Sequence, residues 1–237
     1  MPLSTESDSV TSITSSIDIA GQPYIDSWES LEKISNTDDH IWSGELQRKP
    51  PTFGMYAESI ENAVRDGFDV LCLTPAKTLS PVFTRADAAA SNVRTRHPKR
   101  RIEVLDTGLI GGGIGVVTHA ALISLSKNSE TEAILREVQQ VIQHSQMYCY
   151  TEDLSQVVQA TNIPQITTWR EKGTRDYSIL SLKQGSLSLL AAIPSWGRGG
   201  DRILKLIRAQ SRLNAVSALV QWSDDEERTQ EFIDALQ

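Results

Sequence analysis

The side chains that most often carry catalysis are scattered along this chain. The four histidines lie in unrelated segments: His40, His97, His119 and His144. No serine or cysteine is paired with a histidine by motif, so nucleophilic catalysis has no support in the sequence. The two cysteines, Cys72 and Cys149, have neither metal-ligand spacing nor a disulfide framework around them. We therefore expect no catalytic residues, no metal site and no enzymatic activity.

Two glycine-rich segments could present backbone amides to an anion. The first contains Gly111, Gly112, Gly113 and Gly115, and backbone N–H groups at a helix N-terminus do bind anions. It lacks a following Lys-Ser or Lys-Thr and the dinucleotide-binding spacing, so close packing of the turn against a neighbouring loop is favoured. The second segment, Gly197–Arg202, could contact an anion or a protein partner; the start of a helix explains it equally well.

The predicted elements that position these residues alternate between helices and strands, as in α/β proteins. A helix over Met55–Arg65, stopped by Gly67, leads into the apolar run Val70–Thr74, which predicts a strand buried on both faces. The pattern then repeats, and the elements it predicts are a helix over Phe83–Val93, a strand over Arg101–Asp106, a helix over Gly115–Ser126, a helix capped by Asn128 or Ser129, and a strand over Tyr148–Tyr150.

The segments nearer the two ends of the chain depart from this regular alternation of helices and strands. The predicted elements there are a hairpin over Ile17–Asp26, weak helices over Trp28–Ile34 and Asp153–Ala160, a hairpin of Tyr177–Leu182 and Ser186–Ile193 around Gln184-Gly185, a helix over Asp201–Ser211, a strand over Ala215–Gln221 and a helix over Asp224–Leu236. We predict a flexible tail over residues 1–16, an α/β parallel-sheet domain with flanking helices over 17–150, and a smaller α+β domain over 151–237.

Composition narrows the class of protein. The 237 residues are 39% hydrophobic and 22% charged, as in ordinary globular proteins. The net charge of −7 argues against a nucleic-acid partner, and the basic run Arg94–Arg101 is interpreted as the solvated end of a helix. The N-terminus has no apolar secretory region, and no apolar run is long enough for membrane insertion. A cytoplasmic protein is expected.

The order and spacing of several loops resemble those of the DegV family of bacterial fatty-acid-binding proteins. The loop Arg48–Thr52 corresponds to the family's Thr-Ser-Gln-Pro-Ser, and Gly67–Asp69 to its Gly-Tyr-Asp. The segment Ala76–Val82 falls on Ser-Ser-x-Leu-Ser-Gly-Thr. Asp106 and Thr107, followed by Gly113 and Gly115, match the family's Asp-Ser and glycine-bearing turn, and Asp153, Leu154 and Val157 match Asp-Leu-x-x-Leu.

The resemblance is to a shortened and divergent member. An opening strand with Asp-Ser-Thr is not found, and Ala160–Ile163 stands where the family has Gly-Gly-Arg-Ile. The family's closing segment with glycine and histidine is also not found. The resemblance implies that, in fatty acid kinase subunits, the arginine of Gly-Gly-Arg-Ile and the histidine of the closing segment present the acyl carboxylate to a kinase-type protein partner. Because neither residue is found here, that partnership is in doubt.

The resemblance implies a long-chain fatty acid, or a similar lipid, in a slot between two domains, with no other cofactor. The ligand-binding residues it implies are Ser80, Thr52, Arg48, Thr107, Gly112 and Gly113. Ser80 could equally cap a helix that begins near Pro81, and Thr52 and Arg48 could be plain loop residues. The alternative function is a degenerate DegV-like module for protein interaction or regulation without lipid. A phosphoryl-transfer enzyme of the dihydroxyacetone kinase type is a weaker third hypothesis, because an acid cluster for metal is missing.

Overall fold

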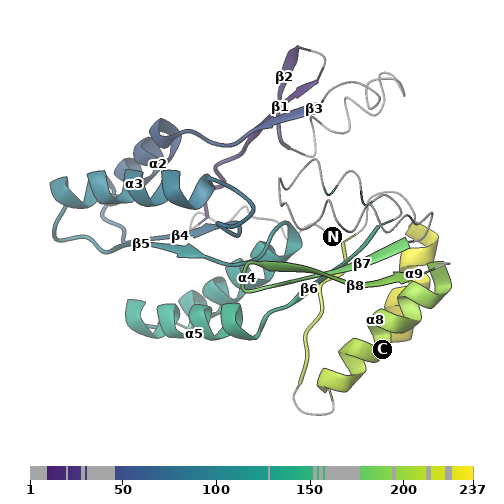
Figure 1. Cartoon of the computed structure of the whole chain (residues 1–237). Helices are drawn as coiled ribbons and strands as arrows, with labels where there is room; N and C mark the ends of the chain where they lie inside the picture. Colours follow the sequence, from purple (N-terminus) through teal and green to yellow (C-terminus); the bar gives the residue numbers. More distant parts are fainter. Residues whose placement is uncertain are drawn as a thin grey trace. The chain divides into compact units, whose positions relative to one another are not determined.

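The structure is a computed structural model that describes residues 10–19, 21–27, 30, 46–127, 129–151, 154, 157, 177–193, 196–211, 215–221 and 226–236. Tertiary contacts divide the chain into two compact units, Met1–Leu105 and Asp106–Gln237 (Figure 1). This division differs from the boundary near residue 150 that the sequence indicates, because a strand at Met147–Thr151 pairs with strands that follow it. The expected mixed α/β class, with a parallel sheet, flanking helices and antiparallel strands, is confirmed.

Unit 1 combines a small antiparallel sheet with a parallel strand pair covered by helices. Its elements are β1 (Ser16–Ile19), β2 (Gln22–Ile25), β3 (Leu46–Lys49), α2 (Phe53–Arg65), β4 (Val70–Thr74), α3 (Val82–Arg96) and β5 (Ile102–Asp106), the last crossing into unit 2 by one residue. The small sheet has the order β2-β1-β3, and β1 is antiparallel to both neighbours. The hairpin predicted over 17–26 is therefore confirmed.

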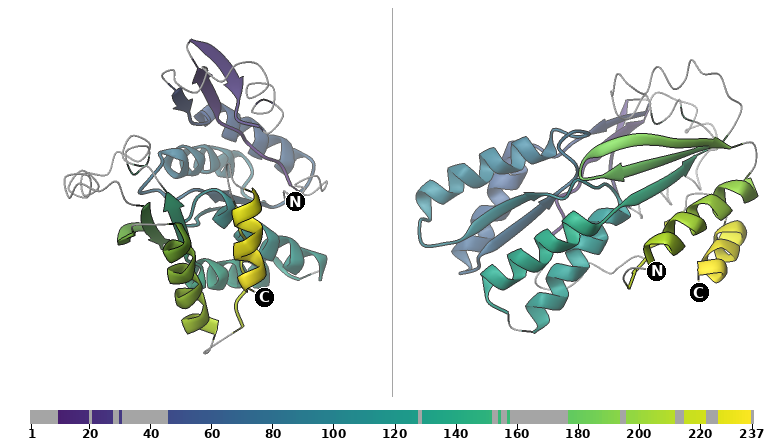
Figure 2. Two further views of the ribbon diagram at one scale, coloured as in Figure 1. Left: turned by 90° about the vertical axis from the view of Figure 1, so that its right-hand side faces the viewer. Right: turned by 60° about the horizontal axis from the view of Figure 1, so that its bottom comes forward.

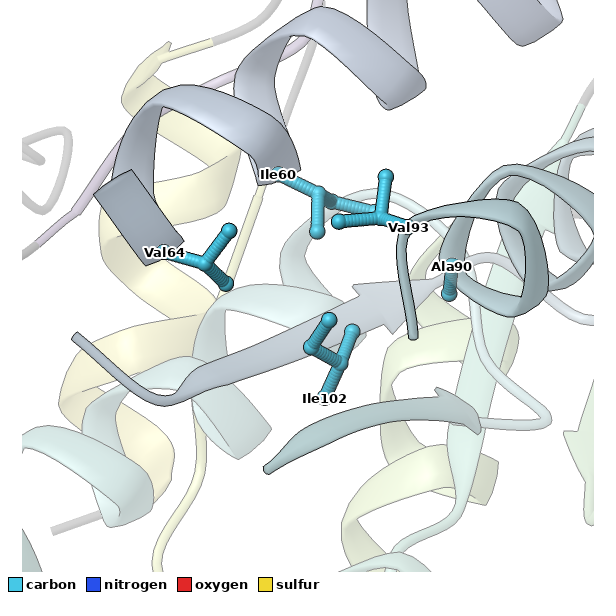
Figure 3. Packing of buried hydrophobic residues seen from close by; sticks show 5 residues of the cluster. All are labelled: Ile60, Val64, Ala90, Val93 and Ile102. Carbon is cyan, nitrogen blue, oxygen red and sulfur yellow. The ribbon is translucent and has the colours of Figure 1, made fainter. Parts of the chain in front are cut away.

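The core of unit 1 lies between helices α2 and α3 and the strand pair β4–β5. Apolar residues recur along α2 at helical spacing, which places Ile60 and Val64 on one face. They pack against Ala90 and Val93 of α3 and Ile102 of β5, and all five side chains are nearly inaccessible to solvent (Figure 3). Strands β4 and β5 point in the same direction in Figure 3 because α3 crosses over between them.

Strand β4 occupies the predicted residues, but it is less buried than predicted. Val70 and Cys72 pack against the helices, whereas only Thr74 at the end of the strand is fully buried. Thr74 donates a hydrogen bond from its hydroxyl to the carbonyl oxygen of Leu105 at 3.1 Å, which ties the ends of β4 and β5 together. The predicted tail, residues 1–16, lies mostly outside the described residues. In its described part Ile13 packs against the core and Ser16 begins β1.

Unit 2 contains two helix pairs and one antiparallel sheet. Its elements are α4 (Gly112–Ser126), α5 (Thr131–His144), β6 (Met147–Thr151), β7 (Tyr177–Lys183), β8 (Ser186–Ile193), α8 (Trp196–Ser211) and α9 (Glu226–Leu236). The sheet has the order β6-β7-β8. Helices α4 and α5 pack side by side, and α8 and α9 form a second adjacent pair (Figure 2). Ile203 of α8 packs on Ile179 and Ile193 of the sheet, with Phe232 of α9 against the same cluster.

The hairpin β7–β8 confirms the turn predicted from Gln184-Gly185. Both residues adopt positive φ, 49° at Gln184 and 76° at Gly185, as a two-residue hairpin turn requires. A register shift beside Ile179 and Leu180 leaves Leu190 unpaired, and its side chain is exposed. Strand β7 is buried along five consecutive residues because it is the central strand of the sheet.

Several predicted elements need correction. Residues 215–221 are not a strand, because within the described chain they join no sheet and most of their side chains are exposed. Helix α5 is preceded by Glu130 at its N-cap rather than by Asn128 or Ser129. Helix α8 begins at Trp196, so Gly197–Arg202 lies within the helix instead of turning into it. The helices predicted over Trp28–Ile34 and Asp153–Ala160 fall largely outside the described residues.

Candidate functional site

The N-terminal ends of α2 and α3 are tied together by one arginine. Arg85, in the first turns of α3, donates from Nη1 to the carbonyl oxygens of Pro50 and Pro51, at 3.1 Å each. These prolines directly precede α2. At the opposite end, Arg96 near the end of α3 pairs with Glu61 of α2. The two helices therefore run in the same direction, and both begin at the same end of unit 1.

Each of these helices begins close to a hydroxyl that the sequence singled out. Thr52 is the N-cap of α2 and its Oγ1 accepts a hydrogen bond from the Met55 amide at 3.3 Å. The Ser80 Oγ accepts from the Val82 amide at 3.4 Å, but the N-cap of α3 is Pro81, so Ser80 lies one residue before the predicted capping position. A hydroxyl that accepts in this way keeps its own hydrogen for donation. Among the described residues neither hydroxyl has an acceptor for that hydrogen.

Arg48 lies in a strand rather than in the loop that the sequence indicated. It belongs to β3, and its Nη2 pairs with Oδ2 of Asp26 at 2.7 Å. The next residue, Lys49, pairs in the same way with Asp18 of β1 at 3.0 Å. Strand pairing with β1 explains the difference, because a four-residue strand has too few residues to show a period. The structure therefore gives Arg48 a carboxylate partner of its own.

Two further side chains at this end were not identified from the sequence. Tyr56 is one helical turn after Thr52, is only 5% exposed, and packs in one cluster with Val82 and Ala86 of α3. Arg85 lies between those two α3 residues in sequence and is partly buried. Two features of the sequence could have identified them. Tyr56 follows Thr52 at i, i+4 spacing, and Arg85 is a cation in the first turns of a helix, where the helix dipole disfavours positive charge.

Burial sets the protonation state of this cluster. Burial raises the pKa of Tyr56 to about 12, an effect that Cys72 reinforces and Arg85 opposes. The phenol is therefore a neutral hydrogen-bond donor at physiological pH. Burial also raises the pKa of the Cys72 thiol to about 11, so this cysteine is not a thiolate nucleophile near neutral pH. The arrangement can bind an acceptor, and it has no activated nucleophile.

In unit 2, the residues from the end of β5 onward form a turn held by hydrogen bonds. The Asp106 Oδ1 accepts from the Gly108 amide at 2.9 Å, and the buried Thr107 Oγ1 accepts from the Leu109 amide at 3.3 Å. Gly108 has φ of 63°, and a Cβ there would lie 2.8 Å from the backbone nitrogen of Gly185. The Gly185 amide also donates to the Gly108 carbonyl at 2.9 Å. Only glycine fits this contact between the turn and the β7–β8 hairpin.

The glycines at the start of α4 are closely packed, in agreement with the favoured interpretation. The Gly112 amide donates to Oε1 of Gln221 at 3.0 Å. A Cβ on Gly112 would lie 2.5 Å from Cδ2 of Leu219, and one on Gly113 would lie 2.9 Å from Cβ of Leu109. The ligand contacts expected of Thr107, Gly112 and Gly113 stay predictions. In α8, Gly199 has the ring of Tyr150 against it, which gives the Gly197–Arg202 segment a packing role.

The C-terminal ends of α2 and α3 meet at a single acid. Glu61 Oε1 accepts from Nε of Arg65 at 3.1 Å and contacts Nε2 of His97 at 2.8 Å. Nη1 of Arg96 lies 3.0 Å from Oε2 of Glu61, an ion pair without a well-directed hydrogen bond. The hydrogen bond with His97, assisted by the nearby cations, holds the pKa of Glu61 below its usual value against the opposing effect of burial.

The basic run is therefore occupied with structural contacts. Arg94 donates from Nε to the Ile102 carbonyl at 2.8 Å, and Arg101 pairs with Glu103 at 3.1 Å. An open pocket of about 310 Å³ lies beside this run, lined by Arg96, His97, Pro98, Lys99 and Arg100. Within the described residues no group of acidic, histidine or cysteine side chains could hold a metal ion. In the same part of the chain, none of the helices has both the length and the apolar character needed to traverse a bilayer.

Solved structures with the same fold come from several bacteria. A fatty acid binding DegV family protein from Streptococcus agalactiae superposes with a TM-score of 0.79 at 14% identity, over 98% of this chain and 81% of the other. A stearic acid-binding protein from Eubacterium ventriosum gives a TM-score of 0.78 at 16% identity, over 94% and 78%. A DegV family protein from Thermus thermophilus, described for its fatty acid binding, gives 0.71 at 19% identity, over 84% and 70%.

The sequence comparisons differ in what they match. A search of curated proteins found no match. A family model described as uncharacterised proteins of the DegV family matches residues 2–237, which is nearly the whole chain. The order of loops, the α/β fold and this match agree, and the chain belongs to the DegV family.

Proposed function

We propose that this protein binds a long-chain fatty acid, or a similar amphiphile with an acidic head, as a carrier in the cytoplasm. The observation that carries the proposal is the pair of hydroxyls of Thr52 and Ser80 at the start of α2 and α3. Each accepts from a backbone amide and keeps a hydrogen to donate. A carboxylate has acceptors only, so it is the natural partner for two such donors.

The charge around the two hydroxyls also favours an acid. Both lie at helix N-termini, where the helix dipole favours negative charge. Arg85 holds a cation at the same end, and Lys77 adds another in the loop that carries Ser80, with its Nζ 5.7 Å from the ring centre of Phe83. The solved structures with this fold that are described as fatty-acid-binding give the ligand class independent support. The expected slot between two domains and the kinase-type partner stay predictions.

The first test is whether the purified protein carries lipid. Denaturing extraction followed by mass spectrometry should release a long-chain fatty acid, and displacement of a fluorescent fatty acid by stearic acid should show binding to delipidated protein. Stearyl alcohol, which has the same chain without the carboxylate, serves as the comparison ligand and should bind more weakly. A protein that releases no lipid and binds neither ligand would contradict the proposed function.

Variants that introduce a negative charge test the place of the carboxylate. Ser80→Asp and Thr52→Asp keep an oxygen that can cap the helix, since aspartate is as good an N-cap as serine. They add a negative charge where we place the head group, so the affinity for stearic acid should fall about tenfold or more. Ser129→Asp is the matched control, because it adds the same charge next to the N-terminus of α5. Its affinity should equal that of the unmodified protein.

A further inference from the structure

The hydroxyl of Tyr56 has no acceptor in the described part of the protein, although the side chain that carries it is almost entirely buried. The side chain is only 5% exposed, and among the described residues its hydroxyl makes no hydrogen bond. Among the described residues, the only fully buried side-chain oxygen or nitrogen without a hydrogen bond is Oε2 of Glu61, so the Tyr56 oxygen is accessible to an acceptor from outside the protein. Helical side chains lean toward the N-terminus of their helix, so the phenol covers the turn that begins at Thr52.

Arg85 is a cation that lacks a carboxylate in the same cluster. It is partly buried, and Nη1 is used by two neutral carbonyl oxygens, those of Pro50 and Pro51. Across the described part of unit 1, no acidic side chain pairs with it. A partly buried guanidinium without a counter-charge is costly, and carbonyl dipoles offset only part of that cost.

The two side chains share one environment. Tyr56 packs on Val82 and Ala86, the residues of α3 that bracket Arg85. Arg85 also lies close enough to affect the ionisation of the phenol. The third polar neighbour, Cys72, stays a neutral thiol near neutral pH because it is buried. The Tyr56 hydroxyl lacks an acceptor and the Arg85 guanidinium lacks a counter-charge. One anionic acceptor would supply both.

We propose that Tyr56 and Arg85 are the direct receptor for the ligand's carboxylate, with the Tyr56 hydroxyl donating to one carboxylate oxygen and the Arg85 guanidinium supplying the positive charge. The inference rests on the proposed function and deepens it, because it names the residues that select an acidic head over a neutral one. Thr52 and Ser80 then complete the set of donors around the head group. Arg48, which already pairs with Asp26, is not needed for this role.

The test is Tyr56→Phe, which removes only the hydroxyl. The affinity for stearic acid should fall about tenfold, because a hydrogen bond to a charged group is lost. The affinity for stearyl alcohol should change little, so the preference for acid over alcohol should shrink by the same factor. The Tm of the variant should not fall, since the hydroxyl has no hydrogen-bond partner among the described residues. Tyr24→Phe, on strand β2 beside Ile17 and Ile19, is the matched control and should bind stearic acid as the unmodified protein does.

The outcomes separate the two proposals. If the unmodified protein binds stearic acid, and Ser80→Asp weakens binding but Tyr56→Phe does not, the carboxylate lies near Ser80 without contacting Tyr56. The receptor inference is then wrong, while the proposed function stands. If the unmodified protein binds neither ligand, both fail. Arg85→Gln should also lose the preference for acid. Because Arg85 holds the Pro50-Pro51 loop in place, Tyr56→Phe remains decisive if the arginine variant does not fold.

Discussion

The two ends of the helix pair α2–α3 use polar side chains in opposite ways. At the C-terminal end, Glu61 is contacted by Arg65, Arg96 and His97, so the acid has two cations and a histidine of the protein itself as partners. At the N-terminal end, Arg85 has only carbonyl partners and Tyr56 has none among the described residues. One end carries its own counter-charge, and the other lacks one.

This difference separates structural polar contacts from binding groups. The basic run near Arg96 has more positive charge than any other part of the sequence, yet its cations complement the ends of helices and a buried acid. The N-terminal end has fewer charges, and among the described residues Arg85 has no carboxylate partner there. The number of charges therefore says less about a binding site than the polar groups that the fold leaves without a partner.

Glu61→Gln should have the largest effect on stability. Among the described residues, the substitution removes the only acid that Arg96 and His97 contact, and it leaves the Arg96 guanidinium without a counter-charge at the end of the helix pair. We expect the Tm to fall by several degrees in thermal unfolding. Glu58→Gln, on the same helix but exposed, is the control and should leave the Tm unchanged. An unchanged affinity for stearic acid would support the separation of the two ends, and a lost affinity in a fully folded variant would break it.

Acid should remove the contribution of Glu61 selectively. Its pKa is lowered in the folded protein, first by the hydrogen bond with His97. A lowered folded pKa means that the stabilisation is present above the unfolded value, about 4.3, and is lost as the pH falls through the folded pKa. The difference in Tm between the unmodified protein and Glu61→Gln should therefore shrink as the pH falls below about 4.5. A difference in Tm that stays constant to pH 3 would show that the ionised Glu61 carboxylate is not the source of the stabilisation.

Thr52→Ala should have a moderate effect on stability because it removes the N-cap of α2. The lost hydrogen bond from the Met55 amide should cost about 1 kcal/mol of unfolding free energy, measured in urea. Thr52→Ser keeps the hydroxyl and is the control. The alanine variant should also bind stearic acid more weakly, whereas the serine variant should bind as before. Equal binding by both variants would remove Thr52 from the head-group site.

Arg65→Gln should have the smallest effect. Arg65 is 67% exposed in its side chain and pairs with Glu61 four residues earlier, an arrangement that stabilises helices by only about 0.3–0.5 kcal/mol. Urea unfolding at low and high salt measures the change, which should be smaller at high salt. A loss above about 1 kcal/mol would show that Glu61 depends on Arg65 rather than on Arg96 and His97.

Much of the fold could be predicted from short-range pattern. The strand over Val70–Thr74 has the predicted bounds, and α2 ends before the predicted stop at Gly67. The β7–β8 turn follows from Gln184-Gly185, because few residues accept positive φ. Residues 215–221 show the limit of such patterns. Their apolar sequence is typical of a strand, but a strand also needs an open sheet edge beside it, and the sequence does not show whether one is available.

The sequence by itself determined the bounds of elements such as β4, and it placed hydroxyls close to the starts of α2 and α3, because capping and periodicity act over a few residues. The tertiary structure decided which polar groups find partners. Arg48 met Asp26, whereas Arg85 met only the carbonyls of Pro50 and Pro51. Such pairings join residues distant in sequence, and burial and geometry, not residue type, determine which charges are compensated.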